Sequence, residues 1–316
     1  MPRLPRGPGA CGAASARWAA RVAASAALAL AACGRGAPAP AGPAIAVVAA
    51  ENAYGSVVAQ IGGPYVHVTS VETNPNTDPH AFEASPAVAR AFAGARLVVI
   101  NGLGYDDWAQ AMMAATASSG RRLVDVQTLL GLPESTPNPH LWYAPNTMPA
   151  VAAAVAADLG AIEPLHAAYF QAALQRFDAS LQPWNAALAA FRSRYPGTPV
   201  AVTEPVGDYL LQAAGCTIAT PFSLQAAIMN GTDPAPQDVT REESLLRNRA
   251  VKVFVYNQQV TDPLTQTFES LARQNHIPIV GVYETMPAGY TYQSWMLAET
   301  QALQRAVATG ASTTRL

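Results

Sequence analysis

Short apolar runs, separated by stretches with helical character, dominate the hydrophobic pattern of the chain. The runs occupy residues 44–49, 65–71, 97–100 and 123–126 in the first half, and residues 199–203, 251–256 and 277–282 in the second. Short valine- and isoleucine-rich runs that alternate with helices are typical of a parallel sheet covered on both faces. The pattern therefore predicts an α/β fold of two α/β domains with mainly parallel sheets.

A long amphipathic helix is expected between the two halves, over residues 165–194. Its apolar residues recur at steps of four and three, at Phe177, Leu181, Trp184, Leu188, Phe191 and Tyr195. This spacing places them on one face of a helix. At 1.5 Å per residue, the helix would be about 45 Å long and could run along both domains. Pro183 lies inside it and is expected to kink it or divide it in two.

The first 33 residues are expected to be an export signal. Arginines precede an apolar run over residues 22–32, which is too short to cross a bilayer because a crossing helix needs about 20 residues. The Leu-Ala-Ala-Cys sequence ending at Cys33 resembles the bacterial lipobox, in which the cysteine carries lipid. An ordinary signal peptide with an unrelated cysteine is the alternative. We expect an exported lipoprotein, anchored in the membrane at the cell surface or in the periplasm.

Five segments follow from these patterns. They are a signal peptide with lipobox (1–33), a Gly-, Ala- and Pro-rich tether (34–43), an N-terminal α/β domain (44–160), the connecting helix (161–197) and a C-terminal α/β domain (198–316). If Cys33 carries lipid and Cys11 leaves with the signal, only Cys216 remains, so no intramolecular disulfide is expected. The hydrophobic core must then hold the fold, which we expect to be a monomer.

Charge and motifs exclude several classes of function. The chain has 19 basic and 21 acidic residues and no Lys/Arg-rich run, so nucleic acid is not an expected partner. No phosphate-binding loop, dinucleotide-binding glycine pattern or HExxH motif occurs in the sequence.

Two of the five histidines share an unusual context. His80 follows Asp78-Pro79, and His140 follows Asn138-Pro139, each in a segment too rich in proline for a helix or strand. Proline restricts the backbone directly before each imidazole, which limits the directions of the ring and suits a ligand. Ordinary surface loops are the alternative. The other three histidines, at positions 67, 166 and 276, have no such context and are expected to be structural.

Two glutamates follow predicted strands in the second half of the chain. Glu204 ends the run PVAVTE, and Glu284 ends IPIVGVYE. Ligands of open α/β sheets bind beyond the carboxyl ends of the strands, although a single glutamate there could equally cap a helix. Two histidines from one half and two glutamates from the other suggest a site in the cleft between the domains.

Several long motifs resemble the metal-specific solute-binding proteins of ABC transporters, the family that includes zinc- and manganese-binding lipoproteins. They include DPHAFEASP around His80, NGLGYDDW from Asn101, NPHLW around His140, TEPVGDYLLQAAG after Thr203 and VYNQQVTDP from Val255. The segment from Gly281 to Met296 adds to the resemblance, which covers residues 44 to about 308.

The resemblance implies a four-ligand metal site formed by His80, His140, Glu204 and Glu284. Glu284 departs from the commoner aspartate at the fourth position. The family further implies a protein without catalytic activity that captures a divalent transition metal and delivers it to a membrane permease with its ATPase. A surface adhesin with a structural metal, or a metallohydrolase with Glu284 as general base, are the alternative functions.

The ligand types leave the metal open. Carboxylates suit manganese, whereas imidazole suits zinc and the affinity order favours zinc at any site with nitrogen ligands. Zinc takes four single contacts in a tetrahedron. Manganese prefers five or six, which bidentate glutamates could supply. Zinc and manganese therefore both remain candidates as cargo of the site, and iron is a third.

The lipobox interpretation predicts that Cys33→Ser releases the protein from membranes and leaves metal affinity unchanged. Acyl chains contribute about 0.8 kcal/mol per buried CH₂ and would be the main attachment. Fractionation of cells that express the variant measures this release. A variant that stays in the membrane fraction would show that Cys33 is not the anchor.

Overall fold

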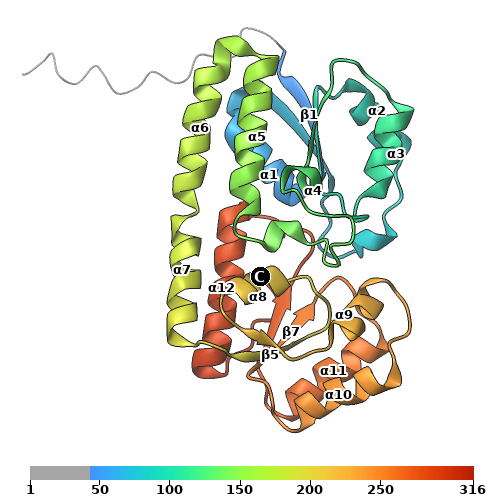
Figure 1. Cartoon of the computed structure of the whole chain (residues 1–316), viewed down its shortest axis with the longest axis vertical. Coiled ribbons are helices and arrows are strands. Elements are labelled where there is room, and N and C mark those ends of the chain that lie inside the picture. Colours follow the sequence, from blue (N-terminus) through green and yellow to red (C-terminus); the bar gives the residue numbers. More distant parts are fainter. Residues whose placement is uncertain (1–42) are drawn as a thin grey trace, which may run out of the picture. The chain divides into compact units, whose positions relative to one another are not determined.

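Within residues 43–316, the part that the computed structural model describes, eight short strands form two parallel sheets (Figure 1). The strands are β1 (Ile45–Glu51), β2 (Val66–Glu72), β3 (Leu97–Ile100), β4 (Arg122–Asp125), β5 (Pro199–Val202), β6 (Thr217–Ile218), β7 (Val253–Asn257) and β8 (Ile279–Val282). Seven of them match the expected apolar runs, and only the two-residue β6 was not anticipated. The expected signal, Cys33 and almost all of the tether lie outside the described residues.

The two sheets have the same topology. Their strand orders are β2-β1-β3-β4 and β6-β5-β7-β8, and every neighbouring pair is parallel. Because parallel strands need a crossover, helices lie between them in the sequence and cover the sheets. This arrangement confirms the predicted fold class of two α/β domains with parallel sheets.

Helices cover both faces of each sheet (Figure 1). Those of the first half are α1 (Asn52–Gly62), α2 (Pro86–Gly94), α3 (Asp107–Ala115), α4 (Val126–Leu129) and α5 (Thr147–Ile162). Those of the second half are α8 (Asp208–Ala213), α9 (Phe222–Met229), α10 (Pro236–Arg247), α11 (Pro263–Gln274) and α12 (Tyr292–Thr309). Side chains alternate between the two faces of a strand. On β1, for example, Val48 packs with α2 and α3, whereas Val47 packs with α1 and α5.

Two consecutive helices, α6 (Ala167–Ser180) and α7 (Gln182–Arg194), replace the single long helix that the apolar spacing predicts. The break falls at Leu181, and Pro183 lies in the first turn of α7, where its missing N–H needs no partner. Pro183 thus divides the segment, as expected. The predicted apolar face is buried from Phe177 to Phe191.

One hydrophobic core extends through both halves of the described chain. Helix α12 contributes much of it, because its residues Tyr292, Trp295 and Met296 are fully buried and the helix packs against α1, α7, β7 and β8. The Trp184 indole donates to Thr300 Oγ1 at 3.1 Å, and the Tyr292 hydroxyl donates to the Trp142 carbonyl at 2.7 Å. The two halves are therefore packed against each other through α12.

Glu299 is a buried carboxyl group in this shared core. Its Oε1 accepts a hydrogen bond from the Trp295 indole at 2.7 Å and lies 3.0 Å from the Tyr143 hydroxyl oxygen. The same hydroxyl lies 2.7 Å from the Tyr283 carbonyl oxygen. One hydroxyl proton cannot serve both acceptors, so a protonated Glu299 fits the geometry better than an ionised one. Burial raises the pKa of Glu299 to about 8, despite the opposing effect of hydrogen bonds from Tyr143 and Trp295.

The raised pKa of Glu299 makes the stability of the metal-free protein pH-dependent. The unfolded carboxyl loses its proton near pH 4.5 and the folded one near pH 8. Folding therefore favours the protonated form, and this contribution to the free energy of unfolding falls as pH rises from about 4.5 to 8. The slope reaches about 1.4 kcal/mol per pH unit for one group.

Glu299→Gln should remove this part of the pH dependence, because the amide keeps a donor and an acceptor and carries no charge. We expect the variant to gain stability relative to the unmodified protein at pH 8 and to lose that advantage near pH 5. Denaturant unfolding with a chelator present measures both. Glu269→Gln, in an exposed ion pair with Arg273, is the control and should show no such trend. Parallel pH profiles for the unmodified protein and Glu299→Gln would contradict a protonated Glu299.

Candidate metal centre

His80 lies in a short 3₁₀ turn, Pro79–Ala81, beyond the carboxyl end of β2. Asp78 caps this turn, since its Oδ1 accepts the backbone N–H of His80 at 2.8 Å. Pro79 occupies the first turn and is buried. The Asp-Pro-His sequence thus fixes the backbone from two sides, once through the proline ring and once through the carboxylate cap.

His140 has an equivalent arrangement and is fully buried. Asn138 Oδ1 accepts the backbone N–H of His140 at 3.0 Å and lies 2.8 Å from its Nδ1. The Asn138 amide cannot be reversed, because its Nδ2 donates to the Pro205 carbonyl at 2.8 Å. Since an amide oxygen only accepts, Nδ1 of His140 carries a proton and a neutral ring has its lone pair on Nε2.

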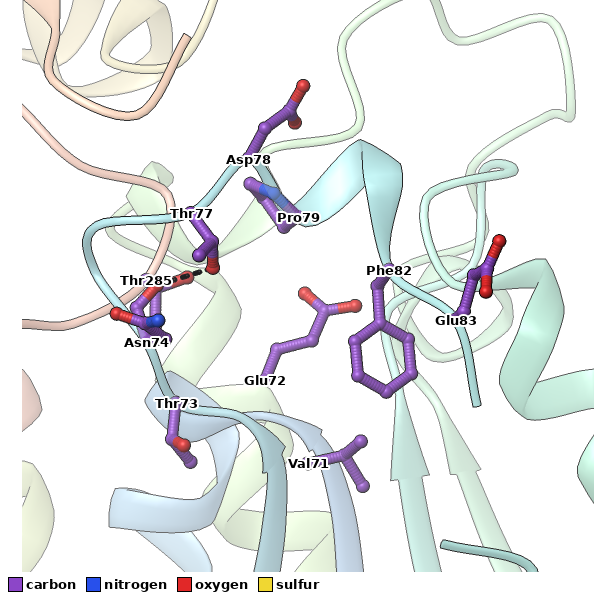
Figure 2. A pocket seen from close by; sticks show the side chains of 10 residues that line it. All are labelled: Val71, Glu72, Thr73, Asn74, Thr77, Asp78, Pro79, Phe82, Glu83 and Thr285. Carbon is purple, nitrogen blue, oxygen red and sulfur yellow. Dashed lines mark hydrogen bonds between the residues drawn. The ribbon is translucent and has the colours of Figure 1, made fainter. Parts of the chain in front are cut away.

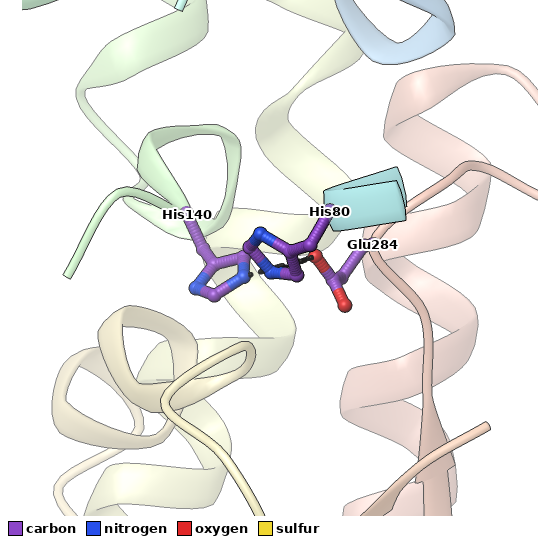
Figure 3. A group of neighbouring side chains, drawn as sticks. All are labelled: His80, His140 and Glu284. Atoms are coloured by element: carbon purple, nitrogen blue, oxygen red, sulfur yellow. Dashed lines mark hydrogen bonds and ion pairs between the residues drawn. The ribbon is translucent and has the colours of Figure 1, made fainter. Parts of the chain in front are cut away.

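Glu284 brings the two histidines together across the halves of the chain (Figure 3). Its Oε2 lies 3.2 Å from Nε2 of His80 and 3.2 Å from Nε2 of His140. The Tyr105 hydroxyl donates to the same oxygen at 3.0 Å. His80, His140 and Glu284 form the group whose ligand atoms all lie within 4.8 Å of one another in the described part of the chain.

The charges of this group depend on one another. Burial alone would raise the pKa of Glu284, but hydrogen bonds and positive charge from His140 and His80 outweigh it and hold the pKa well below its usual range. Burial lowers the pKa of His140, and Glu284 offsets this only in part. For the less buried His80, the hydrogen bond and charge of Glu284 overcome burial and raise the pKa.

Glu204 lies near this group but does not join it. Its Oε1 accepts a hydrogen bond from Asn257 Nδ2 at 3.1 Å, and the same nitrogen donates to Glu284 Oε1 at 2.8 Å. Its Oε2 is buried and has no hydrogen-bond partner among the described residues. Burial and the charge of Glu284 raise the pKa of Glu204 well above its usual range. Three of the four predicted ligands therefore converge, and the fourth is linked to them through one amide.

The other three histidines lie away from the group. His67 is exposed on β2, and His166 stacks on Tyr65 with ring centroids 4.0 Å apart. His276 lies in the turn before β8 and has a positive φ of 54°.

Several residues that shape the site lie in motifs noted in the sequence, but were not predicted as part of the site. Tyr105 and Asn257 touch Glu284 directly, and Gln259 Oε1 accepts the Glu284 backbone N–H at 2.7 Å. Gln259 also donates to the Thr77 carbonyl at 2.7 Å, so it links the His80 loop with the Glu284 loop. Asn138 had a usable signal, because it occupies the same place before His140 that Asp78 occupies before His80.

Two pockets adjoin the His80 loop. One, of about 620 Å³, includes His80, Asp78 and Asp262 and opens the site to solvent. The other, of about 520 Å³, lies beside Pro79 and Phe82 and is lined by Glu72, whose carboxylate points into it (Figure 2). Burial raises the pKa of Glu72 to about 8. None of the three converging side chains lines this second pocket.

Two parallel α/β domains with a histidine–carboxylate group between them define the metal-binding class of ABC-transporter solute-binding proteins. The family model ZnuA, described as zinc-uptake complex component A, periplasmic, matches residues 47–306. The chain therefore belongs to the ZnuA family, which confirms the resemblance noted in its motifs.

Solved structures share the fold. A ZnuA crystal structure is 20% identical, with a TM-score of 0.68 over 84% of this chain and 100% of that one. FpvC from Pseudomonas aeruginosa, in complex with Mn²⁺, is 20% identical, with a TM-score of 0.69 over 84% of this chain and 98% of that one. The periplasmic zinc-binding protein TroA from Treponema pallidum is 17% identical, with a TM-score of 0.70 over 85% and 100%.

No helix within residues 43–316 combines the length and the apolar character that a membrane crossing requires.

Proposed function

We propose that this protein is the extracytoplasmic binding component of a metal ABC transporter. It captures a divalent transition metal, zinc or manganese, with His80, His140, Glu284 and Glu204. It delivers the ion to a membrane permease driven by an ATPase and performs no catalysis itself. Export and a lipid anchor at Cys33 belong to the same proposal.

The contact between His140 Nε2 and Glu284 Oε2 carries this proposal. The Asn138 amide oxygen keeps the proton of a neutral His140 on Nδ1, so a lone pair on Nε2 faces a carboxylate oxygen at 3.2 Å. Two electron-rich atoms at this distance repel each other unless a cation lies between them. Burial disfavours a proton on His140. A bound metal ion resolves the conflict.

The spacing of the three ligand atoms supports a shared ion. Ligands about 2.0–2.1 Å from a zinc ion in a tetrahedron lie about 3.3 Å from one another. The observed separations of Glu284 Oε2 from both imidazole nitrogens are 3.2 Å. The Asn138 bond to His140 Nδ1 is the outer contact that orients most metal-bound histidines.

Glu204 is proposed as the fourth ligand. Its Oε2 is buried and without a partner, which is costly for a carboxylate. Burial and the negative charge of Glu284 both disfavour the ionised form of Glu204. A divalent cation beside Glu284 would stabilise that ionised form. A modest movement of this side chain would complete a set of two nitrogens and two oxygens.

Related structures support a divalent ion as cargo. TroA is described as zinc-binding, FpvC has been solved with Mn²⁺ and with Ni²⁺, and a periplasmic metal-binding protein of Candidatus Liberibacter asiaticus has been solved with Cd. In this protein, the group of His80, His140 and Glu284 would hold such an ion.

Replacing either histidine should abolish tight binding. We expect His80→Ala or His140→Ala to weaken zinc and manganese affinity about a hundredfold or more, beyond the 10–100-fold typical of outer contacts. Calorimetric titration of chelator-stripped protein measures it. His67→Ala, an exposed histidine on β2, is the matched control and should bind as the unmodified protein does. Equal affinities for all three variants would refute the ligand assignment.

Metal affinity should fall steeply on acidification, because bound ligands must be deprotonated. The raised pKa values of His80 and Glu204 favour competing protons on these two groups, whereas the lowered pKa of His140 disfavours one there. Each competing proton lowers the apparent affinity about tenfold per pH unit.

Affinity titrations between pH 5 and 8, in buffers that do not bind metal, measure this dependence. If Glu204 is a ligand, Glu204→Gln should reduce the slope of log affinity against pH by one proton. The part of the slope that comes from the two histidines should remain. A profile that is flat down to pH 5 would show that the histidines do not bind the ion.

A further inference from the structure

Asn257, the last residue of β7, holds both glutamates of the site at once. Its side chain is buried, and its Nδ2 donates to Glu284 Oε1 at 2.8 Å and to Glu204 Oε1 at 3.1 Å. An amide nitrogen carries two hydrogens, so it can serve both carboxylates without sharing.

The orientation of this amide is fixed by its other partners. Asn257 Oδ1 accepts the backbone N–H of Gln259 at 3.0 Å, and the Asn257 backbone N–H donates to Thr203 Oγ1 at 3.0 Å. A reversed amide would place two N–H groups against each other and an oxygen against two carboxylates. The donor side therefore faces the glutamates.

One oxygen of each glutamate remains for an ion. On Glu284 it is Oε2, which faces both histidines, and on Glu204 it is Oε2, which is buried and unpartnered. For either glutamate to bind through both oxygens, it must give up its bond to Asn257. A hydrogen bond to a charged, buried group is among the stronger ones in proteins, so this exchange is unfavourable.

We propose that Asn257 restricts both glutamates to one oxygen each, and thereby makes the site select zinc over manganese. The inference rests on the proposed function and goes further by naming the ion. Two imidazole nitrogens and two single carboxylate oxygens are the four contacts of tetrahedral zinc. Manganese favours oxygen-rich sites with more ligands, which two bidentate glutamates would provide.

Water molecules cannot easily replace the second carboxylate oxygens as ligands for manganese. His140, Glu204 and Glu284 are buried, and His80 is the partly exposed member of the group, with 25% of its side chain accessible. A six-coordinate ion would need two water molecules from the His80 side, where the 620 Å³ pocket opens. Each bound water costs ordering entropy. The preference for zinc therefore follows from two features together: the Asn257 amide, which holds one oxygen of each glutamate, and the burial of the ligands, which limits access of water.

Asn257→Ala tests the proposal through the ratio of the zinc and manganese affinities. We expect this ratio to fall about tenfold or more, because freed carboxylate oxygens add ligands for manganese and add little for zinc. Competition with a chromophoric chelator measures both affinities in chelator-stripped full-length protein. X-ray absorption of the zinc and manganese complexes should show more oxygen ligands around manganese in the variant than in the unmodified protein.

Two further variants keep the result interpretable. Asn257→Leu keeps the size of the side chain and removes the donor without adding a carboxylate, so it should lower the same ratio even if Asn257→Ala fails to fold. Asn101→Ala removes a buried amide that supports the Pro139 carbonyl and touches neither glutamate. It should weaken both ions alike and leave the ratio unchanged.

The outcomes separate this inference from the proposed function. Unmodified protein that binds neither ion overturns the metal-binding function itself. Unmodified protein that binds zinc, with an unchanged affinity ratio in both Asn257 variants, overturns only the role of Asn257. Bidentate glutamates in the manganese complex of the unmodified protein would overturn it as well.

Discussion

The burial of an ionised carboxylate, Glu284, is the constraint on which the site depends. No lysine or arginine in the described part of the chain pairs with it, so other groups must compensate its charge. The hydroxyl of Tyr105 and the amide of Asn257 donate to its oxygens, and two imidazoles flank it. His80, His140 and Tyr105 come from the first half of the chain and Asn257 from the second. The same carboxylate thus organises the ligands and joins the halves.

The shared core makes this arrangement precise. Helix α12 packs on the second sheet, on α1 and on α7. Its Glu299 reaches Tyr143, which contacts the backbone of Tyr283 directly before Glu284. The Gln259 side chain also fixes the site, because it accepts the backbone N–H of Glu284 and donates to the backbone carbonyl of Thr77. Coordination tolerates errors of only a few tenths of an ångström. Rigid packing behind the ligands therefore matters as much as the ligands themselves.

Sequence patterns predicted most strands and helices and the two histidines of the site, because these depend on residues close together in the sequence. Apolar runs predicted seven strands, Pro183 predicted the division of the long helix, and the Asp-Pro and Asn-Pro contexts singled out His80 and His140. The two-residue β6 carries too little pattern to be recognised. The metal-binding role of all four residues remains a proposal, although three of them converge in the structure.

Other parts of the site could not be predicted from the sequence, because they depend on pairs of distant residues. Tyr105 and Glu284 are 179 positions apart, and the bond between Asn257 and Glu204 spans 53. The motifs around Tyr105 and Asn257 can be recognised in the sequence, but they do not show which glutamate each residue will contact. The link between Glu204 and Glu284 is of the same kind, since it runs through the side chain of Asn257.

The repeated strand order has a consequence for how such a site can diverge. Residues at matching strand ends correspond in the two halves: Glu51 at the end of β1 matches Glu204 after β5, and Asn101 after β3 matches Asn257 at the end of β7. The two sheets thus repeat one structural unit, whereas both imidazoles come from loops of the first half only. Changes in those loops can alter the nitrogen donors while the strands of both sheets stay intact. The sheets position the site, and the loops in which the two halves differ determine its nitrogen ligands.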